Sequence, residues 1–142
     1  MSGLEIVLEY LPFSLKQYIH EFLVKKEPFP NDTNNHIEEI RLRNNKPLAL
    51  KFEQGTLITD YNVSQQDVLQ SFEKICESSV YSYRKQICDG YITIKGGNRV
   101  GIVGSAVVDN GQVININYIS SLNFRIASQR IGCSNRIIED LI

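Results

Sequence analysis

The 142-residue sequence predicts a single α+β domain, in which helices pack on a mainly antiparallel or mixed sheet. Two segments, residues 11–24 and 64–77, carry apolar residues at the three- and four-residue spacing of a helix. Several other segments alternate apolar and polar residues, which is typical of strands with one solvent-exposed face. Short turns separate these segments, and one turn contains the Asn-Gly pair favoured in tight hairpins.

Composition agrees with a soluble globular domain. Hydrophobic residues make up 42% of the chain and charged residues 22%, and no apolar run approaches the ~20 residues of a membrane span. The three cysteines are odd in number and match no zinc or redox spacing, so we expect reduced thiols in a cytosolic compartment. The two histidines lack a neighbouring Cys or His at ligand spacing, so no metal site is predicted.

The net charge of −1 is unevenly distributed along the chain. Residues 1–83 carry a charge of −4 and residues 84–142 a charge of +3. A mildly basic second half suits contacts with phosphate groups. It falls short of the footprint of a nucleic-acid-binding domain, whose isoelectric point is usually above ~9, so a nucleic-acid partner is not expected.

The first predicted elements are a helix and a hairpin. The helix covers Leu11–Val24, with Ser14 as its N-cap. After a polar, proline-containing loop, residues 38–43 and 48–52 alternate around an Asn44-Asn45 turn. The charges of the first strand, Glu39 with Arg41 and Arg43, are attributed mostly to pairing across strands.

The middle of the chain predicts a short strand and two helices. The strand covers Thr56–Thr59, and the first helix, Ser64–Glu77, begins with a capping box formed by Ser64 and Asp67. A shorter helix is expected over Val80–Cys88.

The second half predicts four strands and two tight turns. Asn110-Gly111 is expected to form a two-residue hairpin turn that pairs Val108 with Val113 and Val107 with Ile114. The strand before this turn is apolar on both faces, so we expect it to be central and covered on both sides. The strands are Tyr91–Ile94, Arg99–Val108, Gln112–Tyr118 and Leu122–Ile126, and the other turn is Gly96-Gly97.

The most distinctive string is Gly96-Gly97-Asn98-Arg99-Val100-Gly101. Its glycines would allow backbone amides to approach a phosphate, and Arg99 would supply charge. The string is not a Walker A loop, because no Gly-Lys-Ser/Thr follows, nor a Rossmann fingerprint, because a strand follows it. Spacing alone favours a simpler interpretation, a hairpin turn in which Gly101 and Gly104 make room for a packed helix.

Arg125 is the other candidate contact residue. It lies on the polar face of the last predicted strand, with Arg130 beyond it, and both side chains would reach a ligand or a neighbouring subunit. The alternative is a solvated face with surface ion pairs of little energetic value. No Ser/His/Asp or Cys/His nucleophile set is evident, so no catalytic residue is assigned.

Four strings, in this order and spacing, resemble the N-terminal region of the stage III sporulation protein AA family, which is similar to the ATPases of type II and type IV secretion systems. The resemblance extends from about Glu38 to Cys133. The strings are Glu38–Arg43 with Pro47-Leu48, Ser78–Ser82, Gly90–Ile94 running into Gly96–Gly101, and Ile119–Ala127 ending in Gly132-Cys133.

The resemblance implies a fold similar to the N-terminal domain of secretion ATPases, with residues 1–142 as one such domain. The family's ATPase core and P-loop, expected after Ile142, are absent, so this chain alone would not hydrolyse ATP. ATP and Mg²⁺ would belong to the full-length parent, and no cofactor is expected here.

The resemblance further implies a homo-oligomeric ring, usually a hexamer, in which this domain contacts its own ATPase core and neighbouring subunits. The ring would energise transport through the channel between mother cell and forespore, with other stage III sporulation proteins as partners. It would lie in the mother-cell cytoplasm, peripheral to the membrane.

The residues matching the family's phosphate-facing positions are Arg99 and Arg125, with Arg130 as a third candidate. The family usually has His at position 98 and Arg at positions 105 and 128. This chain instead has Asn98, Ser105 and Ser128, so those roles do not transfer.

Two other functions stay open at this point. A stand-alone nucleic-acid-binding module would use the basic second half with Tyr81 and Tyr83, whose rings would stack on bases. A protein-interaction adaptor would use exposed hairpin edges.

Overall fold

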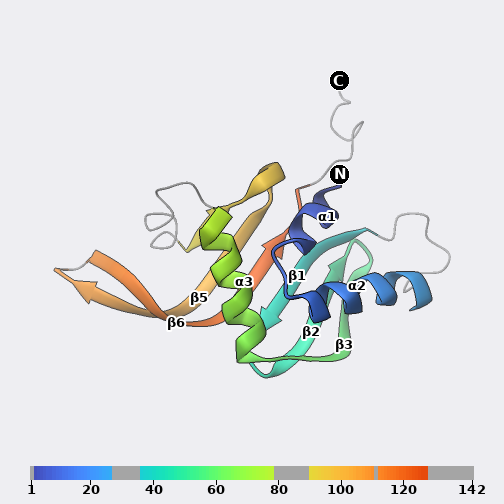
Figure 1. Cartoon of the computed structure of the whole chain (residues 1–142), viewed down its shortest axis with the longest axis horizontal. Coiled ribbons are helices and arrows are strands. Elements are labelled where there is room, and N and C mark those ends of the chain that lie inside the picture. The colour runs from blue at the N-terminus through green and yellow to red at the C-terminus, as the bar shows by residue number, and fades with distance from the viewer. Residues whose placement is uncertain (1, 27–35, 79–89, 111, 128–142) are drawn as a thin grey trace, which may run out of the picture.

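Three helices and six strands make up the described part of the chain (Figure 1). The computed structural model describes residues 2–26, 36–78, 90–110 and 112–127, with backbone alone at 106–109 and 112–117. The elements are α1 Gly3–Leu8, α2 Phe13–Lys26, β1 Ile37–Arg43, β2 Lys46–Phe52, β3 Gly55–Val63, α3 Gln65–Ser78, β4 Tyr91–Thr93, a 3₁₀ turn η1 Lys95–Gly97, β5 Arg99–Asp109 and β6 Gln112–Arg125.

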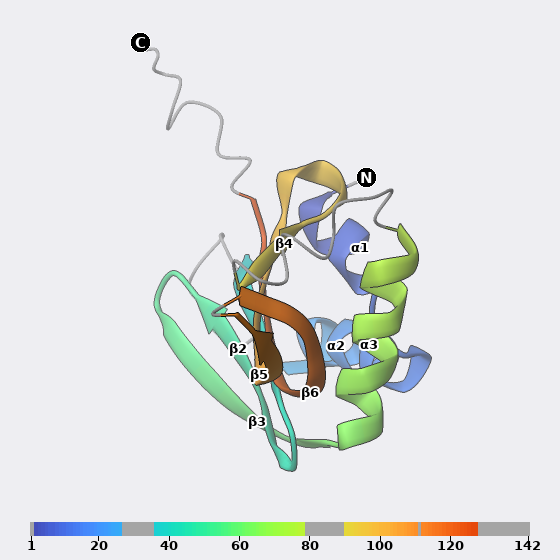
Figure 2. The same ribbon diagram turned by 90° about the vertical axis from the view of Figure 1, so that its left-hand side faces the viewer.

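The strands form one sheet in the order β3-β2-β1-β6-β5-β4, and each neighbouring pair is antiparallel. All three helices lie on the same side of this sheet (Figure 2). We call the other side the open face, because no described helix covers it. The α+β class and the antiparallel sheet are therefore confirmed.

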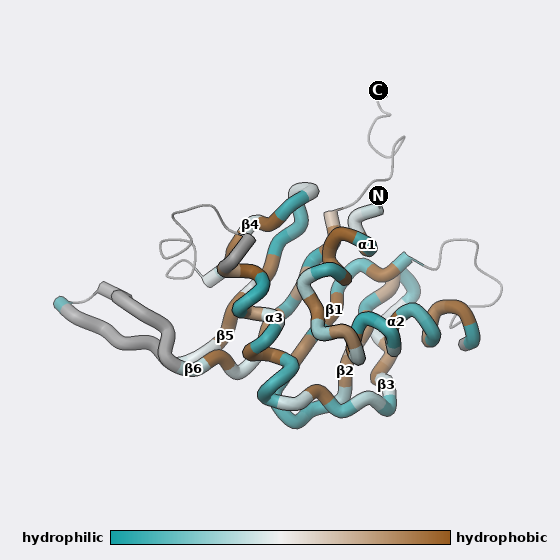
Figure 3. Tube along the Cα trace, viewed as in Figure 1, coloured by the Kyte–Doolittle hydropathy of each residue, from teal (hydrophilic) through white to brown (hydrophobic). Residues whose placement is uncertain are grey.

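The core lies between the sheet and the helices. Side chains alternate between the two faces along each strand, so every second side chain points toward the helices. Figure 3 shows that hydrophobic and hydrophilic positions also recur along α3, as expected for a helix with one buried face. One cross-sheet row of this core is completely or almost completely buried: Ile92, Val100, Phe124, Ile40 and Leu50. The helices complete the core with Val7, Leu8, Leu15, Ile19, Val68 and Ile75.

Local capping chemistry predicted one helix start correctly and another wrongly. At α3, the Asp67 amide donates to Ser64 Oγ at 3.0 Å and the Ser64 amide donates to Asp67 Oδ2 at 3.1 Å, which confirms the capping box. Ser14 lies inside α2, where its hydroxyl is 3.2 Å from Tyr61 Oη, so it is not the N-cap. α1 was not predicted, although Ser2 and Glu5 form a capping box at its start.

The first hairpin is confirmed, and its turn places Asn45 at φ 58°. β3 runs over Gly55–Val63 and is much longer than the predicted Thr56–Thr59. Pairing with the whole of β2 extends it, which local alternation did not reveal. The helix predicted over Val80–Cys88 lies outside the described residues.

The second hairpin turns at Asn110, whose φ is 52°, while Gly111 lies outside the described residues. Val108 pairs with Val113 as predicted, but Val107 pairs with Asn115 and not with Ile114, because the register shifts between Val107 and Val108. The two strands predicted on either side of position 120 are one continuous strand, β6.

β5 is not the central, doubly covered strand that its apolar sequence predicted. β4 pairs only with Arg99–Gly101, so beyond that segment β6 is the single described neighbour of β5. Val103 is accordingly 60% exposed. The far halves of β5 and β6 project from the sheet as a two-stranded ribbon (Figure 1).

Among the described residues, no helix combines the length and the hydrophobicity that a membrane span requires.

Candidate functional site

A glycine turn positions Arg99 at the start of β5. Gly96 and Gly97 have φ values of 80° and 77°, a left-handed conformation that glycine adopts without a steric penalty. The Ile94 amide donates to the Asn98 carbonyl at 2.8 Å and closes the turn. The predicted tight turn is therefore confirmed, and β5 begins directly after it.

Asn98 connects this turn to the end of β6. Its side chain is completely buried; Nδ2 donates to the Lys95 carbonyl at 2.8 Å, and Oδ1 accepts from the Ala127 amide at 2.8 Å. Both bonded atoms are backbone atoms, so Asn98 joins two segments 29 residues apart in sequence. This role was not predicted, because nothing in the local sequence shows that residue 127 returns to the turn.

Arg99 and Arg125 are direct cross-strand partners on β5 and β6. Both side chains are exposed on the open face, and that of Arg125 is 67% exposed. Two positive charges directly opposite each other on adjacent strands repel. The structure thus brings together two of the three candidate arginines, while Arg130 lies outside the described residues.

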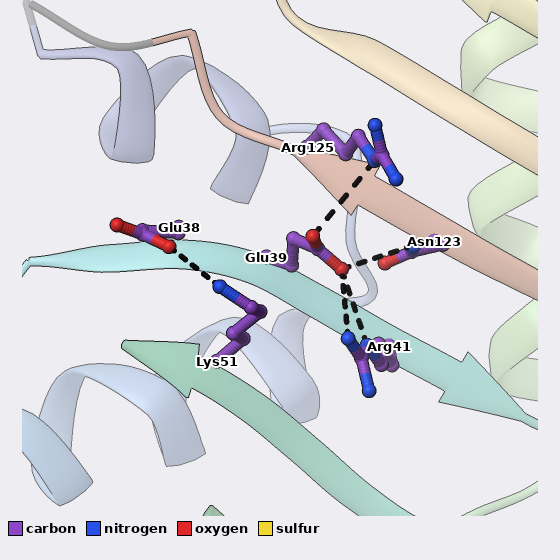
Figure 4. A network of polar contacts seen from close by, with 6 residues as sticks. All are labelled: Glu38, Glu39, Arg41, Lys51, Asn123 and Arg125. Atoms are coloured by element: carbon purple, nitrogen blue, oxygen red, sulfur yellow. Dashed lines mark hydrogen bonds and ion pairs between the residues drawn. The ribbon is translucent and has the colours of Figure 1, made fainter. Parts of the chain in front are cut away.

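Each arginine has a separate partner that draws it to one side. Arg99 Cζ lies 5.4 Å from the centre of the Tyr91 ring, within the range of a cation–π contact. Arg125 Nε lies 3.8 Å from Glu39 Oε2 (Figure 4). These contacts hold the two guanidinium groups on the same face but toward opposite edges of the sheet.

Glu39 is the hub of the polar contacts on the open face (Figure 4). Its Oε1 accepts from Asn123 Nδ2 at 3.1 Å and from Arg41 Nε at 3.2 Å. Burial alone would raise the pKa of Glu39, whose side chain is 14% exposed. The hydrogen bonds from Asn123 and Arg41, together with the charges of Arg41 and Arg125, outweigh burial and lower the pKa below its ordinary value.

This geometry corrects the expected pairing of Arg41, which contacts Glu39 of its own strand and not a charge on a neighbouring strand. Residues two apart on a strand share a face, so the spacing of Glu39 and Arg41 was the signal for this pair. The contribution of Asn123 was not predicted, because it depends on the register between β1 and β6.

The cluster has an excess of positive charge. Arg41, Arg99 and Arg125 contribute three guanidinium groups and Glu39 one carboxylate, which leaves two positive charges in excess. The nearby Lys51 ammonium lies 2.8 Å from Glu38, so that pair is neutral by itself. A surface with two uncompensated guanidinium groups suits a ligand with several negatively charged oxygens.

The two strand glycines do not make room for a helix, contrary to the simpler interpretation of the string. Gly101 pairs with Asn123 on the open face, where no described helix packs. A Cβ at Gly104 would lie 1.9 Å from the Tyr118 carbonyl oxygen, so this glycine accommodates the backbone of β6.

The other candidate positions do not join this cluster within the described residues. Tyr81, Tyr83, Ser128 and Arg130 lie outside the described residues, and Ser105 is exposed on β5. Within the described ranges, no group of three or more His, Cys, Asp or Glu side chains is arranged to hold a metal ion.

Comparison with known proteins identifies the family to which the chain is similar. A family model described as "Sporulation stage III, protein AA" matches residues 15–142. "Stage III sporulation protein AA" of Bacillus subtilis (strain 168) is 30% identical over 132 residues, which cover 93% of this chain and 41% of that protein. The chain therefore spans about two-fifths of the length of this curated relative.

Proposed function

Because the chain belongs to the sporulation stage III protein AA family, which gives it a sporulation-related role, we propose that it is the N-terminal domain of a secretion-type ATPase. The matched region covers 41% of the longer relative, and the remaining length of that protein leaves room for a catalytic core. This core would hold ATP and Mg²⁺ and hydrolyse ATP, and the present domain would not.

The observation that carries the proposal is the direct pairing of Arg99 and Arg125 on the open face. In a homo-oligomeric ring this face would lie against the nucleotide site of the core or of a neighbouring subunit. A guanidinium group stays charged at all physiological pH values and donates two parallel hydrogen bonds to phosphate oxygens. Phosphate would then relieve the repulsion between the two arginines, which couples nucleotide state to domain position.

The cellular part of the proposal follows the family. The ring, a hexamer by analogy with secretion ATPases, would energise the channel between mother cell and forespore. It would lie on the mother-cell side, in the cytoplasm and peripheral to the membrane, with other stage III sporulation proteins as partners. The excess positive charge of the open face supports a role for this domain in contacting phosphate within that assembly.

Alanine substitutions of the two arginines test the proposal. In this chain, Arg99→Ala and Arg125→Ala should change the free energy of unfolding by no more than ~0.5 kcal/mol, because both side chains are exposed. In a full-length protein with a P-loop core, the same variants should lower ATP turnover. Arg43→Ala is the matched control, since Arg43 is an exposed arginine two rows away on the same sheet.

Wild-type turnover of both full-length arginine variants would refute a role for this surface at the nucleotide. A stop codon directly after residue 142 in the native gene would refute the multidomain ATPase itself. An equal loss of ATP turnover in the Arg43→Ala control would show that turnover depends on the overall positive charge of the domain and not on the paired arginines.

A further inference from the structure

Gly101 lies at the centre of the open-face cluster. On β5 it is two residues from Arg99, and it pairs with Tyr91 of β4 on one side and Asn123 of β6 on the other. Arg125 is the diagonal neighbour, one row away on β6. A position without a side chain is therefore surrounded by two arginines, a tyrosine and an asparagine.

The fold does not require glycine at this position. Gly101 has no left-handed φ, and an added Cβ would meet its nearest atoms, Cβ and O of Asn123, at an ordinary 3.9 Å. Gly96 differs, because its φ is 80° and an added Cβ would lie 2.9 Å from the Ile6 side chain. Gly104 also differs, because an added Cβ would clash with the backbone of β6. Glycine in a strand interior lowers stability, so its presence at 101 has another cause.

The neighbours of Gly101 indicate what that cause is. Tyr91 is 42% exposed, and Arg99 leans toward its ring, so the guanidinium group lies beside the Gly101 row. Asn123, the partner of Gly101 on β6, donates from Nδ2 to Glu39 Oε1 at 3.1 Å. The glycine thus leaves main chain accessible between cationic and polar side chains, the setting in which a ligand approaches a strand closely.

We infer that Gly101 is the floor of the anion site proposed above, and that a phosphate group of the ligand lies over it between Arg99 and Arg125. This inference rests on the proposed function. Any side chain at 101 would stand where the phosphate lies and would keep it from reaching both guanidinium groups. The ligand class is a polyphosphate, either inorganic or part of a nucleotide.

The experiment measures stability and anion binding of this chain with Gly101→Ala. Thermal unfolding gives stability, and NMR titration with sodium tripolyphosphate and, separately, with ATP gives affinity. We expect a midpoint of unfolding equal to or above wild type, and affinity about tenfold lower, the factor for loss of one charge-assisted contact of about 1.4 kcal/mol. Thr56→Val, an exposed position at the other edge of the open face, is the control and should leave affinity unchanged.

The two ligands distinguish the sources of the phosphate. Weaker binding of both ligands supports a phosphate over Gly101. Weaker binding of ATP alone overturns that placement, because it shows that another part of the nucleotide contacts this position. Unchanged affinity of Gly101→Ala for both, while Arg125→Gln loses binding, overturns the inference and leaves the arginine site intact. Failure of the wild-type chain to bind either ligand at millimolar concentration overturns the anion site and the inference with it.

Discussion

Glu39→Gln is the most informative stability variant, because Glu39 joins β1 to β6 through charge-assisted contacts. The substitution keeps the size of the side chain and one acceptor oxygen but removes the negative charge. Hydrogen bonds to charged groups contribute ~1.5–3 kcal/mol and neutral ones ~0.5–1.5 kcal/mol. Glu39 accepts hydrogen bonds from Asn123 and Arg41, and its side chain is only 14% exposed. We therefore expect Glu39→Gln to lower the free energy of unfolding by about 1–2 kcal/mol at neutral pH.

The pH dependence of this loss follows from the lowered pKa of Glu39. A carboxyl group whose pKa is lower in the folded state than in the unfolded state stabilises the protein at pH values above its ordinary pKa of 4.5. This stabilisation is lost as the pH falls through the pKa of the folded state. Below that pH the wild-type side chain is neutral, like glutamine. The difference in the free energy of unfolding between wild type and Glu39→Gln should therefore be largest near neutral pH and decrease on acidification.

Urea unfolding followed by circular dichroism at neutral pH and at about pH 3 measures both quantities. Glu21→Gln is the control, because Glu21 forms an exposed pair with Lys25 at 3.9 Å and should change stability by less than ~0.5 kcal/mol. If the loss of unfolding free energy caused by Glu39→Gln is the same at both pH values, or no larger than that caused by Glu21→Gln, then the charge of Glu39 does not stabilise the fold and this reasoning is refuted.

Two further variants test the backbone around the site. Asn98→Ala should lower the free energy of unfolding by ~2–4 kcal/mol, because the Lys95 carbonyl and the Ala127 amide both lose their buried partner; a loss below ~0.5 kcal/mol in chemical denaturation would contradict this. Gly104→Ala should be more damaging than Gly101→Ala in the same thermal scan, since its Cβ would lie 1.9 Å from the Tyr118 carbonyl oxygen; equal midpoints would show that β5 relieves the clash by shifting.

Local sequence determined the elements whose signals lie within a few residues. The capping box of Ser64 and Asp67, the left-handed glycines of the turn before Arg99, and the alternation in β1 and β2 are all set by neighbouring residues. The resemblance to the sporulation family likewise depended on short strings in order, and comparison confirmed it. These features do not require knowledge of which strands become neighbours.

Tertiary structure decided what depends on strand order and register. Arg99 and Arg125 are 26 positions apart in sequence, and the antiparallel register of β5 and β6 makes them direct partners. The same register brings Asn123 to Glu39, and the short length of β4 leaves β5 exposed where its apolar sequence predicted burial. Alternation specifies which residues share a face of one strand, but the pairing of distant strands depends on hydrogen bonds and packing over the whole sheet, and no local pattern encodes it.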